Sequence, residues 1–182
     1  MTPDWNEVAA LAAVAASATA ITAIIIEGRR ARFRQRVEIL LRFEERFDSP
    51  VMRLQRKVAV DALKNGRYDD AEPVLDFFET VGLLVAKGSL DLIMVQNSFL
   101  SWIHLYYYTS RDHIAAERAK SPDTWYYLTT MYERMLRLKA AKLHVRIEQL
   151  RPSETAIRQF YMYEGKDIQA DVARPKVSTV PG

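Results

Sequence analysis

Residues 74–85 read VLDFFETVGLLV, and this segment is the strongest indication of the fold class. It is apolar on nearly every helical face, and a helix of that kind lies at the centre of a bundle rather than at its surface. Asp70 with Pro73 predicts the start of the helix, and Gly88 is expected to cap its end. The chain is therefore predicted to be all-α, with an N-terminal transmembrane helix continuing into a cytoplasmic bundle of about five to six helices.

Start and stop signals on either side of this stretch mark the neighbouring helices. Ser49-Pro50 has the residue types of an N-cap and a first helical position, and Asn65-Gly66 ends that helix near Lys64. The helix after residues 74–85 is expected to pack antiparallel to it, because only a short connection joins them. After the central helix, the sequence predicts helices over about 90–108, 111–120, 124–150 and 153–163.

The composition excludes several classes of protein. Six Gly and seven Pro in 182 residues are few for an all-β chain, which needs frequent turns. Cysteine is absent, which excludes disulfide scaffolds and thiolate metal sites. The net charge of +3 is unevenly spread, since residues 29–64 carry eleven Lys or Arg against five Asp or Glu. Because this surplus lies beside an apolar run rather than across the folded part, we expect no nucleic-acid partner.

An uncharged run of nineteen residues, Val8 to Ile26, precedes the basic region. As a helix it would reach about 28 Å, close to the thickness of the hydrocarbon core of a bilayer. A buried soluble helix and a cleaved signal peptide are the alternatives. The signal peptide is disfavoured because Asp4 and Glu7, rather than basic residues, come before the run. The run therefore predicts a single membrane span.

The arginines that follow the run predict its orientation. Basic residues beside a span are retained on the cytoplasmic side, so we expect the N-terminus outside and the C-terminal domain inside, at a cell inner membrane. Trp5 is placed to lie at the outer interface, and the arginines could hold anionic lipid headgroups. The predicted interfacial cations are Arg29, Arg30, Arg32, Arg34 and Arg36.

Four parts of the chain follow from these signals. They are an anchor at 1–28, a basic juxtamembrane helix at 29–48, a helical bundle at 49–152, and a short helix with a mobile tail at 153–182. The span is expected to continue into the juxtamembrane helix without a break. An apolar stripe on the juxtamembrane helix is predicted at Phe33, Val37, Leu40 and Phe47.

Small residues at four-residue spacing lie on one face of the predicted span. They are Ala12, Ala16 and Ala20, and such a face lets two membrane helices approach closely. A homo-oligomer formed through this face is therefore an open prediction.

Sequence motifs for catalysis, nucleotide binding or metal binding are missing. The chain has no HExxH, P-loop, GxGxxG or GxSxG, and we expect neither an enzyme nor a bound cofactor or metal. The three histidines, His104, His113 and His144, are far apart in sequence. His113 and Glu117 lie one helical turn apart, but two ligands do not make a site.

Two groups of residues remain as candidates for a functional site. Glu79 lies in the most apolar helix, where an unpaired carboxylate would be costly, so we predict an ion pair with Arg118. That pair is either structural or part of a ligand or proton site. Aromatic residues also cluster on either side of the predicted helix 111–120, and side chains of this kind favour interfaces. The predicted partner surface consists of Tyr107, Tyr108, Trp125 and Tyr126.

The order of these features resembles a known family. An Ala-rich anchor and an Arg-rich helix are followed by Phe77-Phe78-Glu79 with Gly82, by the turn at residues 88–91, and by IAAER at 114–118. This pattern, over most of residues 8–136, is similar to a bacterial family of short membrane-anchored proteins known as domain of unknown function 4760. The resemblance implies a bacterial source, an inner-membrane anchor and a helical cytoplasmic domain. It also implies that Glu79, Gly88 and Arg118 match polar and turn positions of the family pattern.

Two classes of function are compatible with this sequence. The first is a membrane-tethered interaction module whose aromatic surface or basic helix binds a protein partner. The alternative is an oligomeric membrane effector, a pore-forming or exclusion protein, assembled through the Ala-rich helix. An enzyme that uses Glu79 with Asp76 is disfavoured, because no nucleophile or further base is placed beside them.

Overall fold

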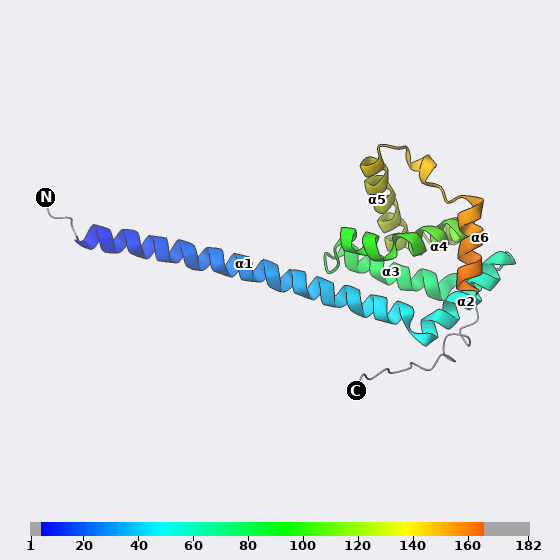
Figure 1. The fold of residues 1–182 in the computed structure, drawn as a ribbon, viewed down its shortest axis with the longest axis horizontal. Coiled ribbons are helices and arrows are strands. Elements are labelled where there is room, and N and C mark those ends of the chain that lie inside the picture. Colours follow the sequence, from blue (N-terminus) through cyan, green and yellow to red (C-terminus); the bar gives the residue numbers. More distant parts are fainter. Residues whose placement is uncertain (1–4, 166–182) are drawn as a thin grey trace, which may run out of the picture. The chain divides into compact units, whose positions relative to one another are not determined.

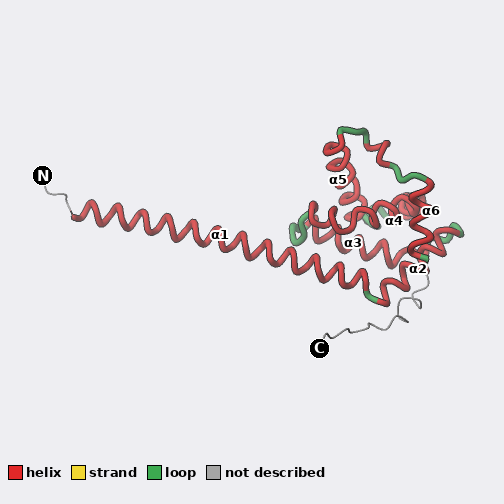
Figure 2. Tube along the Cα trace, viewed as in Figure 1, coloured by secondary structure: helices red, strands yellow, loops and turns green. Residues whose placement is uncertain are grey.

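The computed structural model describes the backbone of residues 5–165 and the side chains of residues 23–165. Every regular element within these bounds is helical, which confirms the predicted all-α class (Figures 1 and 2). The chain divides into two compact units, residues 1–39 and 40–182. The side chain of Trp5, those of residues 8–22 of the predicted span, and most of the predicted tail lie outside the described residues.

Helix α1 runs from Trp5 to Asp48 and confirms that the apolar run and the basic segment form one helix. The predicted apolar stripe is wrong at Phe33, which is 61% exposed, whereas Leu40 and Phe47 are buried in the second unit. Across the residues whose side chains are described, no helix combines the length and hydropathy that a membrane span requires. The transmembrane helix at residues 8–26 therefore stays a prediction.

Helix α2 (Pro50–Lys64) has the predicted ends. The Ser49 hydroxyl accepts a hydrogen bond from the Met52 amide at 3.3 Å, and Asn65 caps the other end. Gly66 follows with a φ of +66°, a conformation in which a side chain would be strained. The sequence signals were correct here because both caps act within one helical turn.

Helix α3 (Glu72–Ala86) lies in the core, as its composition predicted. A 3₁₀ turn at Asp69–Ala71 precedes it, and Gly88 follows it with a φ of +73°. The Ser89 amide bonds the Leu84 carbonyl and the Gly88 amide bonds the Val85 carbonyl, which is the Schellman form of a helix end. The helix packs against α2, α4 and, most extensively, α5. Its buried side chains include Val74, Leu75, Phe77, Phe78, Val81 and Val85.

Helix α4 (Leu92–Lys120) corrects the prediction of two separate helices at 90–108 and 111–120. The helix starts at the Asp91 cap and continues through Thr109 and Ser110, where a break was expected. The Thr109 hydroxyl donates to the Leu105 carbonyl at 2.8 Å, and Ser110 is fully buried. Hydroxyl side chains that bond back to their own helix do not interrupt it when its buried face is packed.

Helix α5 (Tyr126–Leu143) is shorter than the predicted helix 124–150. His144 ends it in the left-handed conformation, with a φ of 54°, and a 3₁₀ turn at Ile147–Leu150 follows. Helix α6 (Glu154–Glu164) lies where a helix over 153–163 was predicted, and the hydroxyl of its N-cap Ser153 accepts from the Ala156 amide. The early end of α5 was missed because no glycine or proline marks it in the sequence.

Candidate functional site

The start of α5 lies directly on one face of α3. A Cβ atom added to Gly82 would be 2.6 Å from the backbone carbon and oxygen of Tyr127 and 3.0 Å from the Leu128 nitrogen. Only a residue without a side chain allows the two backbones this close. Gly82 therefore determines where α5 begins to pack.

Glu79 lies one helical turn before Gly82 and caps α5. Its carboxylate accepts hydrogen bonds from the backbone amides of Tyr127, at 3.1 Å, and Leu128, at 2.6 Å. These are the second and third residues of α5, whose own N-cap Trp125 offers no capping side chain. A carboxylate from another helix thus takes the place of an N-cap side chain.

The predicted ion pair between Glu79 and Arg118 is wrong. None of the ion pairs formed by the described residues joins the two side chains, and the Arg118 Nε is buried without a hydrogen-bond partner. Glu79 needed a partner, as expected, but the donors come from a helix N-terminus. Backbone amides at such a terminus attract negative charge and carry no sequence signature of their own.

Trp125 belongs to the same junction, and its predicted exposure is wrong. The side chain is 5% exposed, and its Nε1 donates to Asp76 Oδ1 at 2.8 Å. Asp76, Glu79 and Gly82 thus occupy one face of α3 at three-residue spacing, and all three hold the start of α5. The carboxylates of Asp76 and Glu79 serve a structural role here.

The other residues of the predicted partner surface lie apart from one another. Tyr126 is 46% exposed and contacts the neighbouring ring of Tyr127. Tyr107 is half-buried, with its ring centroid 4.2 Å from that of Tyr132. Tyr108 is half-buried as well, and the Arg111 guanidinium lies 4.5 Å from its ring centre. Of the four predicted residues, Tyr108 lines a groove together with residues of α5.

That groove, of about 260 Å³, lies between α4, α5 and the 3₁₀ turn at Ile147–Leu150. After α5 ends, the 3₁₀ turn packs against the helix and forms one wall. The lining combines aromatic rings, aliphatic side chains and two guanidinium groups. It consists of His104, Tyr108, Arg111, Tyr132, Leu136, Ile147, Glu148, Leu150 and Arg151.

His104 lies in the wall of this groove as a neutral side chain. Burial and the nearby charge of Lys139 lower the pKa of His104. Its Nδ1 lies 2.8 Å from the Tyr132 hydroxyl, and burial raises the pKa of Tyr132 well above its usual range. Both groups are therefore uncharged at neutral pH, and the charges of the groove come from Arg111, Glu148 and Arg151.

A buried charged network holds α6 against α2 and α4. Arg56 Nε lies 3.0 Å from Glu164 Oε2, and both side chains are almost fully buried. The Tyr106 hydroxyl donates to the same carboxylate at 2.9 Å. Burial raises the pKa of Glu164 against the opposing effects of Arg56 and Tyr106. This network was not predicted, since Arg56 and Glu164 are 108 positions apart and no local sequence pattern indicates that either is buried.

The guanidinium of Arg56 also lies over two aromatic rings. Its Cζ is 4.1 Å from the ring centre of Phe47 and 5.1 Å from that of Trp102. Such stacking explains how a charged residue is tolerated inside the bundle. This network serves the packing of α6 and offers no open site.

The predicted interfacial arginines belong to the first unit. Arg29, Arg30, Arg32 and Arg34 are exposed, and Arg36 is half-buried. Ile24, Ile25 and Ile26, immediately before them, are also exposed. An exposed apolar segment thus lies beside a row of exposed cations.

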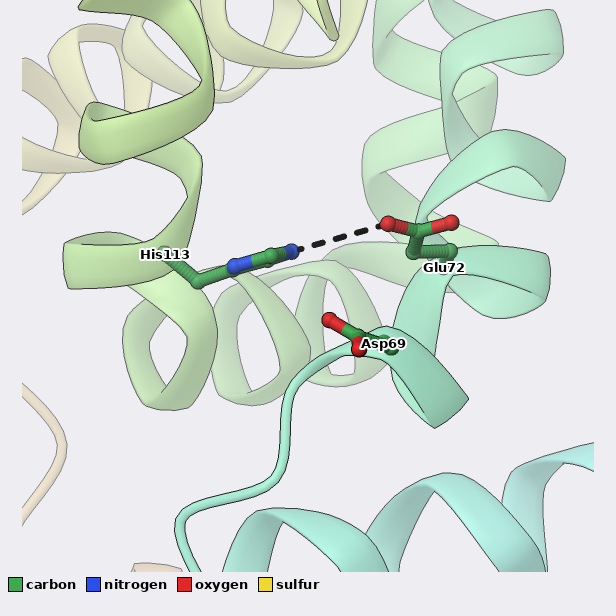
Figure 3. Close-up of side chains that lie close together, drawn as sticks. All are labelled: Asp69, Glu72 and His113. Atoms are coloured by element: carbon green, nitrogen blue, oxygen red, sulfur yellow. Dashed lines mark ion pairs between the residues drawn. The ribbon is translucent and has the colours of Figure 1, made fainter.

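A separate cluster consists of two carboxylates and a histidine. Asp69, Glu72 and His113 each bring one potential ligand atom within 4.8 Å of the others (Figure 3). Glu117, which lies one helical turn from His113, is not part of it, because its carboxylate bonds Lys120 Nζ at 2.6 Å.

A comparison with models of known protein families finds a match over most of the chain. Residues 8–135 match the model of a family described as Domain of unknown function (DUF4760). The chain belongs to this family. The DUF4760 match includes the junction of α3 with α5 and ends within α5, so one wall of the groove and all of α6 lie beyond it. No curated protein and no solved structure matches the chain.

Proposed function

We propose that this protein is a single-pass membrane-anchored interaction module. Residues 8–26 span a bacterial inner membrane, the N-terminus lies outside, and the bundle lies on the cytoplasmic side. The module has no catalytic activity of its own. It binds a partner protein in the groove between α4, α5 and the turn at Ile147–Leu150. The groove is the single observation that carries the binding function.

Several features of residues 8–36 support the anchor. The uncharged run is long enough for a bilayer, and it continues in one helix into the arginine-rich segment. The exposed side chains of Ile24, Ile25 and Ile26 gain a favourable environment in hydrocarbon. The arginines next to them suit the anionic headgroups of a cytoplasmic leaflet.

The lining of the groove supports a partner of defined chemistry. Arg111 and Arg151 oppose the single acid Glu148, so the charge of the groove is positive on balance. Tyr108, Tyr132 and Leu136 supply apolar surface between these charges. We therefore propose an acidic segment of another protein, with an apolar side chain next to its carboxylate, as the bound partner.

The anchor is tested by membrane fractionation. Ser17 lies at the centre of the proposed span, where a charged residue costs about 3 kcal/mol. Wild type and Ser17→Leu should stay in the membrane fraction after alkaline carbonate extraction, whereas Ser17→Arg should be partly released. A C-terminal reporter that is active only outside the cytoplasm should be inactive. Complete release of the wild type by carbonate would remove the anchor from the proposal.

The groove is tested by photo-crosslinking in cells. A benzoylphenylalanine placed at Tyr108 should form an adduct with a partner protein, and the same group at the exposed Tyr126 should not. Arg151→Glu should abolish the adduct at Tyr108, because it reverses one charge of the groove. An adduct with a second copy of the chain would favour the oligomeric alternative. Equal adducts from both positions, or none, would contradict the proposed groove.

A further inference from the structure

The cluster of Asp69, Glu72 and His113 brings three separate elements together (Figure 3). Asp69 is in the 3₁₀ turn before α3, Glu72 is the first residue of α3, and His113 comes from the second half of α4. Both carboxylates are exposed, while only 10% of the His113 side chain is. The cluster is thus open to solvent on the carboxylate side and closed on the histidine side.

The Nε2 atom of His113 points toward the carboxylates without a hydrogen bond. The atom is buried and has no hydrogen-bond partner. Its distance to the nearest carboxylate oxygen, Oε1 of Glu72, is 3.8 Å, which allows an ion pair when the imidazole is protonated (Figure 3) but is too long for a hydrogen bond. A buried nitrogen in this state can still accept a partner, which a water or an ion can supply.

Aromatic packing holds the imidazole in this orientation. The ring of Tyr68 stacks on it with centroids 5.3 Å apart and planes 9° apart. The ring of Trp125 lies 5.5 Å away, and its indole is fixed in turn by the bond to Asp76. The unpaired nitrogen is therefore aimed at the carboxylates by its neighbours, as the ligands of metal sites are.

We propose that Asp69, Glu72 and His113 bind a divalent first-row transition metal ion such as Zn²⁺. One imidazole nitrogen and two carboxylate oxygens are ligands that such ions accept, and the two carboxylates neutralise the charge of the ion. The imidazole disfavours Mg²⁺ and Ca²⁺, which prefer oxygen ligands alone. At metal–ligand distances of about 2.1 Å the three atoms must move slightly closer, and the exposed carboxylates are free to do so.

A bound ion would join the start of α3 to α4. These segments are 41 positions apart in sequence at Glu72 and His113. An ion that binds only the folded chain raises its stability by mass action, so the site is expected to act as a structural clip. Water would occupy the coordination positions on the exposed side. The site is separate from the groove and does not depend on the proposed partner.

Calorimetric titration of the full-length chain with ZnCl₂, in detergent and without a histidine tag, tests the site. We expect one ion per chain and an upward shift of the unfolding temperature. His113→Ala and Glu72→Gln should each weaken Zn²⁺ binding by about tenfold or more. Co²⁺ should bind with visible absorption bands that these two variants lose, and Mg²⁺ should not compete at equal concentration.

Three matched variants serve as controls. Glu117→Gln removes a carboxylate one turn from His113, Asp70→Asn removes the exposed neighbour of Asp69, and His144→Asn removes an exposed histidine. All three should bind Zn²⁺ as the wild type does. Equal binding by the wild type and Glu72→Gln would overturn the site, even if His113→Ala failed to fold. Equal weakening by the controls would overturn it as well.

Discussion

Two pairs of carboxylates at α3 have the same spacing and different surroundings. Asp76 and Glu79 face the start of α5, where one indole N–H and two backbone amides donate to them. Asp69 and Glu72, one to two turns earlier, face the buried Nε2 of His113, which forms no hydrogen bond with them. The carboxylates of the first pair accept hydrogen bonds that hold α5, and those of the second pair accept none from the described residues.

This difference separates a structural role from a binding role. A carboxylate that accepts from fixed donors holds two helices together, and its loss leaves those donors unpaired. A carboxylate that accepts no hydrogen bond, and that lies 3.8 Å from a rigidly held nitrogen, contributes little to packing and remains available to a ligand. The expected consequences differ for stability and for metal binding, and both can be measured.

The largest effect is expected from Gly82→Ala at the junction with α5. The new methyl group would clash with the backbone of Tyr127, which should destabilise the bundle by about 3 kcal/mol. Chemical denaturation followed by circular dichroism measures this. Gly28→Ala is the control, since nothing lies within 4 Å of its Cβ position, and it should leave the unfolding midpoint of the bundle unchanged. A stable Gly82→Ala protein would contradict the close contact.

Glu79→Ala should have the next largest effect, because it removes the cap of α5 and leaves two amides without an acceptor. We expect a loss of about 1–2 kcal/mol, with faster hydrogen exchange at the Tyr127 and Leu128 amides. Glu79→Gln keeps one acceptor and should lose less. Glu133→Ala, which removes an exposed pair with Arg137, should cost no more than about 0.5 kcal/mol. Equal losses at Glu79 and Glu133 would refute the capping role.

Trp125→Phe affects both sites, because the indole donates to Asp76 of the first pair and packs against His113, which faces the second pair. It removes the hydrogen bond to Asp76 and should cost about 1 kcal/mol. The ring beside His113 is also smaller, so Zn²⁺ binding should weaken modestly. Calorimetry and denaturation of the same sample measure both effects. Unchanged stability would show that the bond to Asp76 is not formed in solution.

The smallest effect on stability is expected from Glu72→Gln. Its carboxylate is exposed and lies 3.8 Å from the His113 Nε2, too far for a hydrogen bond, so the unfolding free energy in the presence of a chelator should change by less than about 0.5 kcal/mol. With Zn²⁺ present, the wild type should gain stability and the variant should not. A large loss in chelator would mean that Glu72 already supports the fold without an ion.

Sequence reasoning succeeded where the signal is local. The Ser49 cap, the break at Asn65-Gly66 and the Ser153 start each depend on residues within one turn of the helix end, and all three were predicted. The all-α class and the central place of α3 followed from composition and apolar pattern. The continuity of α4 and the end of α5 at His144 did not, because packing against other helices outweighs weak local preferences there.

For the candidate sites too, local features were predicted correctly and partners distant in sequence were not. Glu79 was identified from sequence as a carboxylate that needs a partner, but Arg118 was the wrong partner. The donors to Glu79 are backbone amides, which every residue type except proline supplies, so the sequence contains no signal for them. His113 was noted beside Glu117, one helical turn away, whereas the carboxylates that it faces come from the start of α3, 41 positions earlier at Glu72.

The helical class, the ends of the helices with strong caps, the family, and the uncharged run with its arginines can all be inferred from the sequence. Which carboxylates hold α5, which face His113, and where the groove lies depend on the packing of the helices. Helix propensity and capping act between residues a few positions apart, whereas the environment of a polar group is set by whichever distant segments the packing of the core brings beside it.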